Sequence, residues 1–262
     1  MNVWETYSFM EFTIKEVELL IKANNFPNFQ LDHLPNAFNN KNEKRFYQKK
    51  DVLGITNRIT RKTNLVRAFL DAVTLTENFL QELCQIVYTD FPDRIKGRAS
   101  SDSGTIVESK DNQSKLLHLI ITSESRAEML ETIIEEKIRG IFYGNPIDFY
   151  VKDKANIGLG NYFKDNHHRT IKRLAEIIAR RNIFIHNDGK VDSKYLREVE
   201  NSEFSLGMIA TLNENYVREN IFILRGFALT VSKLVIENAY KLPVMSGRMK
   251  STITSFNREY NT

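Results

Sequence analysis

Arg181, Asn182 and His186 are the residues whose types and spacing best suit chemistry. They lie within residues 174–196, a stretch whose apolar side chains point in most directions around a predicted helix. A helix that is apolar on most sides is typical of the centre of a bundle. Burying a guanidinium group there costs several kcal/mol unless the group is paired. We therefore expect these polar side chains to meet either structural partners or a ligand.

The spacing of the three residues determines how they face one another. Asn182 and His186 are four positions apart and lie on nearly the same side of a helix, whereas Arg181 and His186 point about 140° apart. One copy of the helix therefore aims Arg181 and His186 poorly at a common point. A second copy, related by a two-fold axis, would supply the missing partner. Because histidine is the commonest proton-transfer residue in enzymes, His186 is the candidate acid or base of this motif.

The run Arg181-Asn182-Ile183-Phe184-Ile185-His186 resembles the signature of the HEPN superfamily (higher eukaryotes and prokaryotes nucleotide-binding). That signature is an arginine, four to six residues and a histidine, commonly with a polar asparagine directly after the arginine. The flanking residues 177–180 and 187–192, and the later pair Tyr195-Leu196, are also similar to bacterial members. The resemblance covers about residues 120–240, and an earlier helix over 63–88 is expected to be the first helix of the same bundle.

The resemblance implies a metal-independent endoribonuclease without a cofactor. It also implies a homodimer in which the Arg–His motifs of the two copies meet at one composite site. It implies that His186 acts as general acid or base, that Arg181 holds the scissile phosphate and that Asn182 positions the site. The RNA 2′-hydroxyl would attack the adjacent phosphate and leave a 2′,3′-cyclic phosphate. Such proteins act as toxins or anti-phage defence effectors, so an antitoxin or a defence-system protein is an expected partner. Two alternatives remain open: a non-catalytic dimeric module that binds RNA, a nucleotide or a protein, and a helical scaffold without a nucleic-acid role.

Positive charge is concentrated just before the motif. The whole chain has 37 Lys and Arg against 33 Asp and Glu, a net charge of +4. Residues 164–181 contain six basic and two acidic side chains, a surplus that equals that of the whole chain. A basic strip suits an RNA backbone, and we expect His167 and His168 to lie on the surface beside it. The predicted RNA contacts are Lys164, Arg169, Lys172, Arg173 and Arg180.

Composition favours long helices as the elements that position this site. The chain has 262 residues, of which 42% are hydrophobic, and only 11 Gly and 5 Pro. Because hairpin-rich folds need many turn residues, the composition predicts an all-α protein with long helices and an N-terminal helical extension. The resemblance implies that these helices form a HEPN-like up-and-down helical bundle. The single cysteine, Cys84, excludes an internal disulfide and a cysteine-cluster zinc site, and is expected in the core. No metal site is predicted.

Apolar and proline patterns divide the chain into three parts. We expect a helical extension over 1–60, the bundle over 61–242 and a C-terminal tail over 243–262. No apolar run approaches the ~18 residues of a membrane span and the N-terminus lacks a signal-peptide pattern, so the expected location is the cytoplasm. Predicted helices cover 3–24, 63–88, 125–141, 165–186 and 214–240, predicted loops or irregular stretches cover 24–42, 96–114 and 147–163, and residues 116–121 are ambiguous between helix and strand.

Glu77 is the one acidic residue on the apolar face of the predicted 63–88 helix. One explanation is that its carboxylate pairs with Arg181 and orients it. The other is that the apolar face is wider than the pattern suggests and that Glu77 reaches water. We favour the second explanation on the sequence alone.

Overall fold

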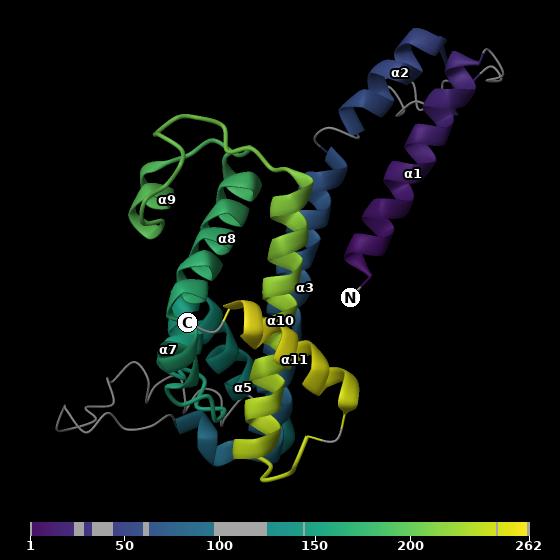
Figure 1. Ribbon diagram of the computed structural model, residues 1–262. Coiled ribbons are helices and arrows are strands. Elements are labelled where there is room, and N and C mark those ends of the chain that lie inside the picture. The colour runs from purple at the N-terminus through teal and green to yellow at the C-terminus, as the bar shows by residue number, and fades with distance from the viewer. Residues whose placement is uncertain are drawn as a thin grey trace.

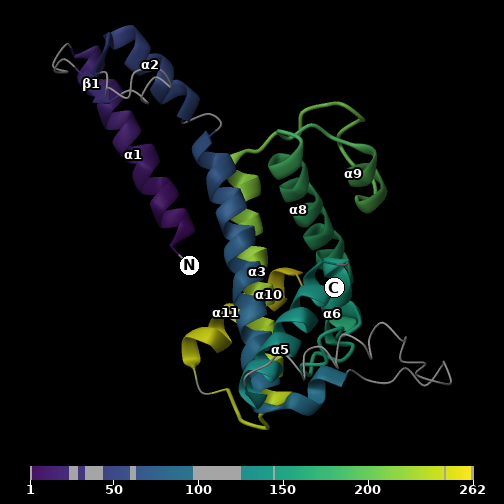
Figure 2. The same ribbon diagram turned by 180° about the vertical axis from the view of Figure 1, so that it is seen from behind.

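The computed structural model describes residues 2–23, 29–32, 44–59, 63–96, 125–143, 145–244 and 246–260. Four long helices form the main bundle: α3 (Asn64–Asp90), α5 (Arg126–Phe142), α8 (His168–His186) and α10 (Glu214–Asn238). α3 and α10 run side by side, and α8 lies beside them (Figures 1 and 2). Most of the described residues are helical, so the predicted all-α class is confirmed at this level.

Local signals in the sequence explain where α5 begins and where α8 ends. Ser125 caps α5, because its side chain accepts a hydrogen bond from the backbone N–H of Glu128 at 3.1 Å. α8 ends at His186, and the next residues Asp188 and Gly189 have φ angles of 50° and 79°. A side chain at position 189 would place its Cβ 2.8 Å from the ring of Phe184. The predicted stop at this point is therefore confirmed.

The core forms where the apolar faces of α3, α8 and α10 meet. Each of these helices contributes fully buried apolar side chains, which include Val87 from α3, Ile177 from α8 and Val231 from α10. Cys84 is also fully buried, as expected, and burial raises the pKa of its thiol to about 12. A thiol in this state is a core residue and not a nucleophile.

Shorter elements complete the bundle, and they correct two expectations. The stretch expected to be irregular contains α6 (Pro146–Val151) and the first part of α7 (Tyr162–Asn166). Between them, the Asp153 carboxylate accepts hydrogen bonds from backbone N–H groups of a turn, including that of Ile157 at 3.0 Å. The expected helix over 165–186 is interrupted, because α8 begins only after His167. The expected loop over 96–114, apart from Lys96 at the end of η2 (Pro92–Lys96), and the run 116–121 lie outside the described residues.

His167 is not on the surface, so that expectation was wrong. The residue is fully buried at the junction of α7 and α8, where its ring stacks on Phe256 at a centroid distance of 5.1 Å. Its Nδ1 lies 3.2 Å from the backbone carbonyl of Tyr260. Phe227 and Phe256, which help to cover the ring, come from segments distant in the chain, so local polarity was misleading. His168, in contrast, is exposed.

The segment expected to be a tail carries a helix, α11 (Gly247–Tyr260), that packs on α10. Phe256 of α11 is fully buried and lies directly over Gly226 of α10. A Cβ at position 226 would lie 2.2 Å from the Phe256 ring, so only glycine allows this close approach. α11 is thus part of the bundle.

The N-terminal extension is attached to the bundle at the beginning of α3. It consists of α1 (Val3–Lys22), α2 (Lys49–Arg58) and an antiparallel pair of strands, β1 (Phe29–Asp32) and β2 (Lys44–Tyr47), which the sequence did not predict. The Tyr7 hydroxyl of α1 donates to Glu214 of α10 at 3.0 Å, and Asn64 of α3 donates to Glu11 of α1 at 2.9 Å. α2 and the far end of α1 project beyond the bundle (Figure 2). No helix within the described ranges is long and apolar enough to cross a membrane.

Candidate functional site

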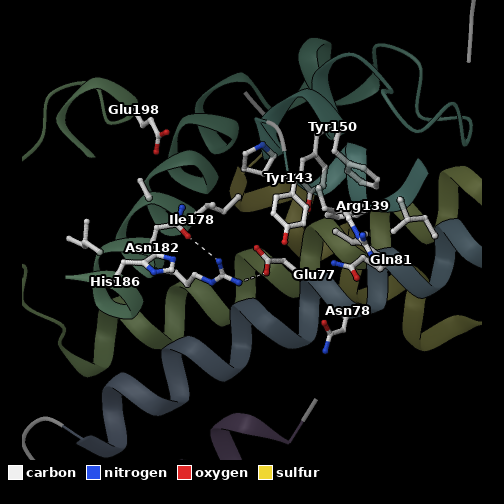
Figure 3. A pocket seen from close by; sticks show the side chains of 18 of the residues that line it. Glu77, Asn78, Gln81, Arg139, Tyr143, Tyr150, Ile178, Asn182, His186 and Glu198 are labelled. Carbon is white, nitrogen blue, oxygen red and sulfur yellow. Dashed lines mark hydrogen bonds and ion pairs between the residues drawn. The ribbon is translucent and has the colours of Figure 1, made fainter. Parts of the chain in front are cut away.

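Arg181, Asn182 and His186 line one groove at the C-terminal end of α8. The groove has a volume of about 1010 Å³, and its walls come from α3, α5, α6, α8 and α9 (Ser193–Glu198). Figure 3 shows Asn182 and His186 together on α8 and Glu77 across from them on α3. The structure therefore brings the three residues predicted from the sequence into one open site.

Glu77 pairs with Arg181, so our preference for a water-facing Glu77 was wrong. The Arg181 Nη2 donates to Glu77 Oε2 at 2.5 Å, across the contact between α8 and α3. The two side chains remain 21% and 26% exposed, which puts the pair at the floor of the groove and within reach of a ligand. Burial raises the pKa of the Glu77 carboxyl above its ordinary value, although the Arg181 charge acts in the opposite direction.

Asn182 contributes a second hydrogen bond to the same guanidinium. The Arg181 Nη1 donates to Asn182 Oδ1 at 3.0 Å. The Arg181 Nε is buried and has no hydrogen-bond partner among the described residues. Glu77 and Asn182 together therefore hold the guanidinium in place and still leave it one unsatisfied donor. His186 is exposed at the last turn of α8.

The groove is more acidic than the sequence suggested. Arg139, Arg181 and Lys194 are the Arg and Lys side chains in its lining. The carboxylates in its lining are Glu77, Glu82, Glu135, Asp192 and Glu198. Phosphate attraction in a single copy of this groove is therefore weak, apart from the local charge of Arg181.

None of the predicted RNA contacts lines this groove. Lys172 and Arg173 line a second groove of about 1040 Å³ on another side of α8. Lys172 pairs with Glu200 at 2.6 Å, and Arg173 pairs with Glu176 at 3.2 Å. Lys164 and Arg169 are exposed and line neither groove. Successive residues of a helix face different sides, so these basic residues do not share a groove with Arg181.

Arg180 was predicted to contact RNA, and this was wrong because only 3% of it is exposed. Its guanidinium pairs with Glu176 at 2.5 Å and with Glu203 at 2.9 Å, and it lies over the ring of Tyr216 at 4.2 Å. Glu176 also accepts hydrogen bonds from the hydroxyls of Tyr195 at 3.2 Å and Tyr216 at 2.8 Å. Such a paired, aromatic-lined arginine is structural.

This buried network ties α9 and α10 to α8, next to the motif. It therefore holds one wall of the groove in place. The four-residue spacing of Glu176 and Arg180 was the signal in the sequence that pointed to an ion pair. The tyrosines gave no such signal, because they come from other elements.

The two grooves meet along α8. Tyr143, Asn182 and Lys194 line both of them, so an extended ligand can follow α8 from one groove into the other.

Within the part of the chain that the structure describes, no three His, Cys, Asp or Glu side chains gather in a way that could hold a metal ion.

Comparison with known proteins found no matching family model, no matching curated protein and no matching solved structure. The residues of the groove are therefore the basis for the function proposed below.

Proposed function

We propose that this chain is a HEPN-type endoribonuclease that cleaves RNA without a metal ion. The observation that carries the proposal is that Arg181, Asn182 and His186 line one open groove, with the Arg181 guanidinium held by Glu77 and Asn182. A fixed guanidinium and an accessible imidazole are the groups needed to stabilise a phosphate charge and to move a proton.

The reaction follows from these groups. The RNA 2′-oxygen attacks the adjacent phosphorus, and the bond from phosphorus to the 5′-oxygen of the next nucleotide breaks. One His186 accepts the proton of the 2′-hydroxyl, and a second proton-transfer group gives a proton to the leaving 5′-oxygen. Arg181 stabilises the negative charge on the phosphate oxygens during the displacement. The products are a 2′,3′-cyclic phosphate and a free 5′-hydroxyl.

A homodimer supplies the second proton-transfer group. Positions 181 and 186 are about 140° apart around the axis of an α-helix, and the acidic lining of the groove weakens phosphate binding by one copy alone. Two copies provide two histidines and two arginines around one phosphate. Exposed apolar side chains around the end of α8 offer a surface for the two-fold contact. They are Ile185, Leu206, Met208 and Ile209, with exposed fractions of 46%, 66%, 50% and 56%.

The test is RNA cleavage by wild-type protein and by His186→Ala. His186 is exposed and has no packing role, so the variant should fold normally, as circular dichroism would verify. We expect its cleavage rate to fall by about 10²-fold or more. The wild-type products should carry 2′,3′-cyclic phosphate ends. Equal cleavage by a folded, contaminant-free His186→Ala preparation would rule out the mechanism.

A non-catalytic binding module is the second candidate, and the Glu77–Arg181 pair favours it. The carboxylate already occupies the guanidinium that a scissile phosphate would need. This candidate predicts binding of RNA, a nucleotide or a protein without cleavage in the same assay.

We propose further that the enzyme acts in the cytoplasm as a toxin or an anti-phage defence effector, and that an antitoxin or defence-system protein restrains it. The resemblance of its motif to HEPN toxins supports this role. Expression of the wild-type chain should slow cell growth, whereas His186→Ala should not. Equal growth of both strains at equal protein levels would contradict the toxin role.

A further inference from the structure

Tyr143 is an exposed aromatic residue where the two grooves meet. It follows the last residue of α5, and 86% of its surface is exposed. It lines both grooves along α8. Figure 3 shows its ring projecting into the groove that contains Arg181 and His186.

This exposure distinguishes Tyr143 from the other aromatic residues. Phe142, Phe149, Tyr150 and Tyr195 also line the first groove, but each is buried or half-buried. The exposed Phe9, Phe12 and Phe79 lie on α1 and α3 and line neither groove. The Tyr143 backbone N–H donates to the Arg139 carbonyl at 2.9 Å, but its side chain has no hydrogen-bond or ring partner among the described residues. Its ring is therefore free to contact a ligand in the groove.

Arg139 lies one turn before Tyr143 on α5 and faces the same side of the helix. It is exposed, lines the first groove and forms no ion pair with any described residue. An unpaired arginine one turn from an exposed aromatic ring is an arrangement suited to a nucleotide, because the ring can stack on a base and the guanidinium can bind its phosphate.

We propose that Tyr143 and Arg139 form a nucleotide subsite that makes single-stranded RNA the substrate. This inference rests on the proposed function and names the substrate class of the same groove. The base of a nucleotide near the scissile phosphate stacks on Tyr143, and Arg139 binds a neighbouring phosphate. The bases of a duplex are stacked on one another, so a duplex presents no free base face to Tyr143.

Because the groove is acidic, we expect base stacking to contribute more to nucleotide binding than attraction of the phosphate backbone. Five carboxylates outnumber the three Lys and Arg side chains of the lining, so attraction of the backbone provides little affinity in one copy. Stacking on an aromatic ring does not depend on net charge and tolerates any base. The subsite therefore gives a preference for unpaired nucleotides without a strong preference for sequence.

Binding of a short single-stranded DNA tests the subsite separately from cleavage. DNA lacks the 2′-hydroxyl nucleophile, so the proposed reaction leaves it intact, but its bases stack equally well. Tyr143→Ala should weaken binding about 5- to 100-fold, which corresponds to the loss of one base–aromatic stack. Tyr143→Phe keeps the ring and should bind within about twofold of wild type. Phe12→Ala removes a comparably exposed ring outside both grooves and should have no effect.

Arg139→Gln and a control variant, Arg126→Gln, test the phosphate contact. Arg126 is exposed at the start of the same helix and lines neither groove. Arg139→Gln should reduce the slope of log affinity against log salt by about one, and Arg126→Gln should leave it unchanged.

Wild-type protein should cleave an RNA faster as a single strand than when it is annealed to its complement.

The outcomes separate this inference from the proposed function. If wild type cleaves RNA but Tyr143→Ala binds single strands as tightly as wild type, the subsite is refuted and the enzyme assignment stands. Equal cleavage of single-stranded and duplex RNA would also refute it. If wild type binds single-stranded DNA through Tyr143 but cleaves no RNA, the nuclease assignment fails and the subsite stands. Absence of any single-strand binding by wild type would overturn the subsite.

Discussion

Replacement of Glu77 tests whether its pairing with Arg181 organises the groove. Glu77→Ala removes the carboxylate at 2.5 Å from the guanidinium, and Glu77→Gln keeps an acceptor oxygen but removes the charge. Glu82 provides a matched control, because it is an exposed carboxylate on the same helix and in the same groove. Glu82→Gln therefore changes the groove charge equally and leaves Arg181 paired.

The expected loss of stability lies between two limits. An exposed ion pair contributes about 0–1 kcal/mol, whereas removal of one partner from a buried pair costs about 3–5 kcal/mol. The Glu77–Arg181 side chains are 26% and 21% exposed, and burial already raises the Glu77 pKa against the attraction of Arg181. We therefore expect Glu77→Ala to lower the free energy of unfolding by about 1–2 kcal/mol, and the Tm by about 2–8 °C. Glu77→Gln should lower the free energy of unfolding by less than Glu77→Ala.

The cleavage activity of the two variants distinguishes loss of the Arg181 orientation from loss of the Glu77 charge. In Glu77→Ala only Asn182 holds the guanidinium, so Arg181 loses its fixed position and RNA cleavage should fall about 10- to 100-fold. Glu77→Gln should retain more of the activity, because the amide oxygen still accepts from Arg181. Thermal denaturation and single-turnover cleavage measure the two effects. If Glu77→Ala were as stable and active as Glu82→Gln, the pair would not organise the site.

The pH dependence of stability gives an independent check of the same pair. The folded-state pKa of Glu77 is raised above its unfolded value, so protonation of this group favours the folded state. The stability that this pKa shift provides is complete at pH values below the pKa of Glu77 in the unfolded state. It is lost as the pH rises through the pKa of Glu77 in the folded state. Relative to wild type, Glu77→Gln should therefore become more stable as the pH rises through that interval. A stability difference that does not change with pH would contradict the direction of this shift.

Other predictions follow from the same structure. Arg180→Ala leaves the buried Glu176 without its main partner and should cost about 3–5 kcal/mol of stability, whereas Arg169→Ala on the surface should cost nothing measurable. RNA cleavage should continue in excess EDTA and DNA should not be cut; loss of activity that magnesium restores would contradict the proposed reaction. The protein should sediment as a dimer, and Ile209→Lys, which adds a charge to the proposed contact, should shift it towards monomer and reduce cleavage. RNA affinity should fall as salt rises, as phosphate contacts require. Gly226→Ala should destabilise the bundle by displacing Phe256, which differential scanning calorimetry would detect.

Signals carried by short stretches of the sequence determined the helices and the composition of the motif. The apolar spacing predicted α3, α8 and α10, and the spacing of Arg181, Asn182 and His186 could be read from the chain itself. Helix formation depends on residues three or four positions apart, and helix caps depend on immediate neighbours, so a single stretch contains the necessary information. The same is true of the stop at Gly189.

The tertiary structure alone decided the partners of the charged and aromatic residues. Glu77 and Arg181 are 104 residues apart, and no local pattern distinguishes a carboxylate that meets an arginine from one that meets water. Arg180 and His167 were both misplaced on the surface. Some of their partners are local, but Glu203 and Tyr216 against Arg180, and Phe227 and Phe256 against His167, come from distant segments. The position of Tyr143 depended in the same way on where the end of α5 lies relative to α8. Burial and pairing are determined by contacts between distant segments, and these contacts exist only once the helices have packed together.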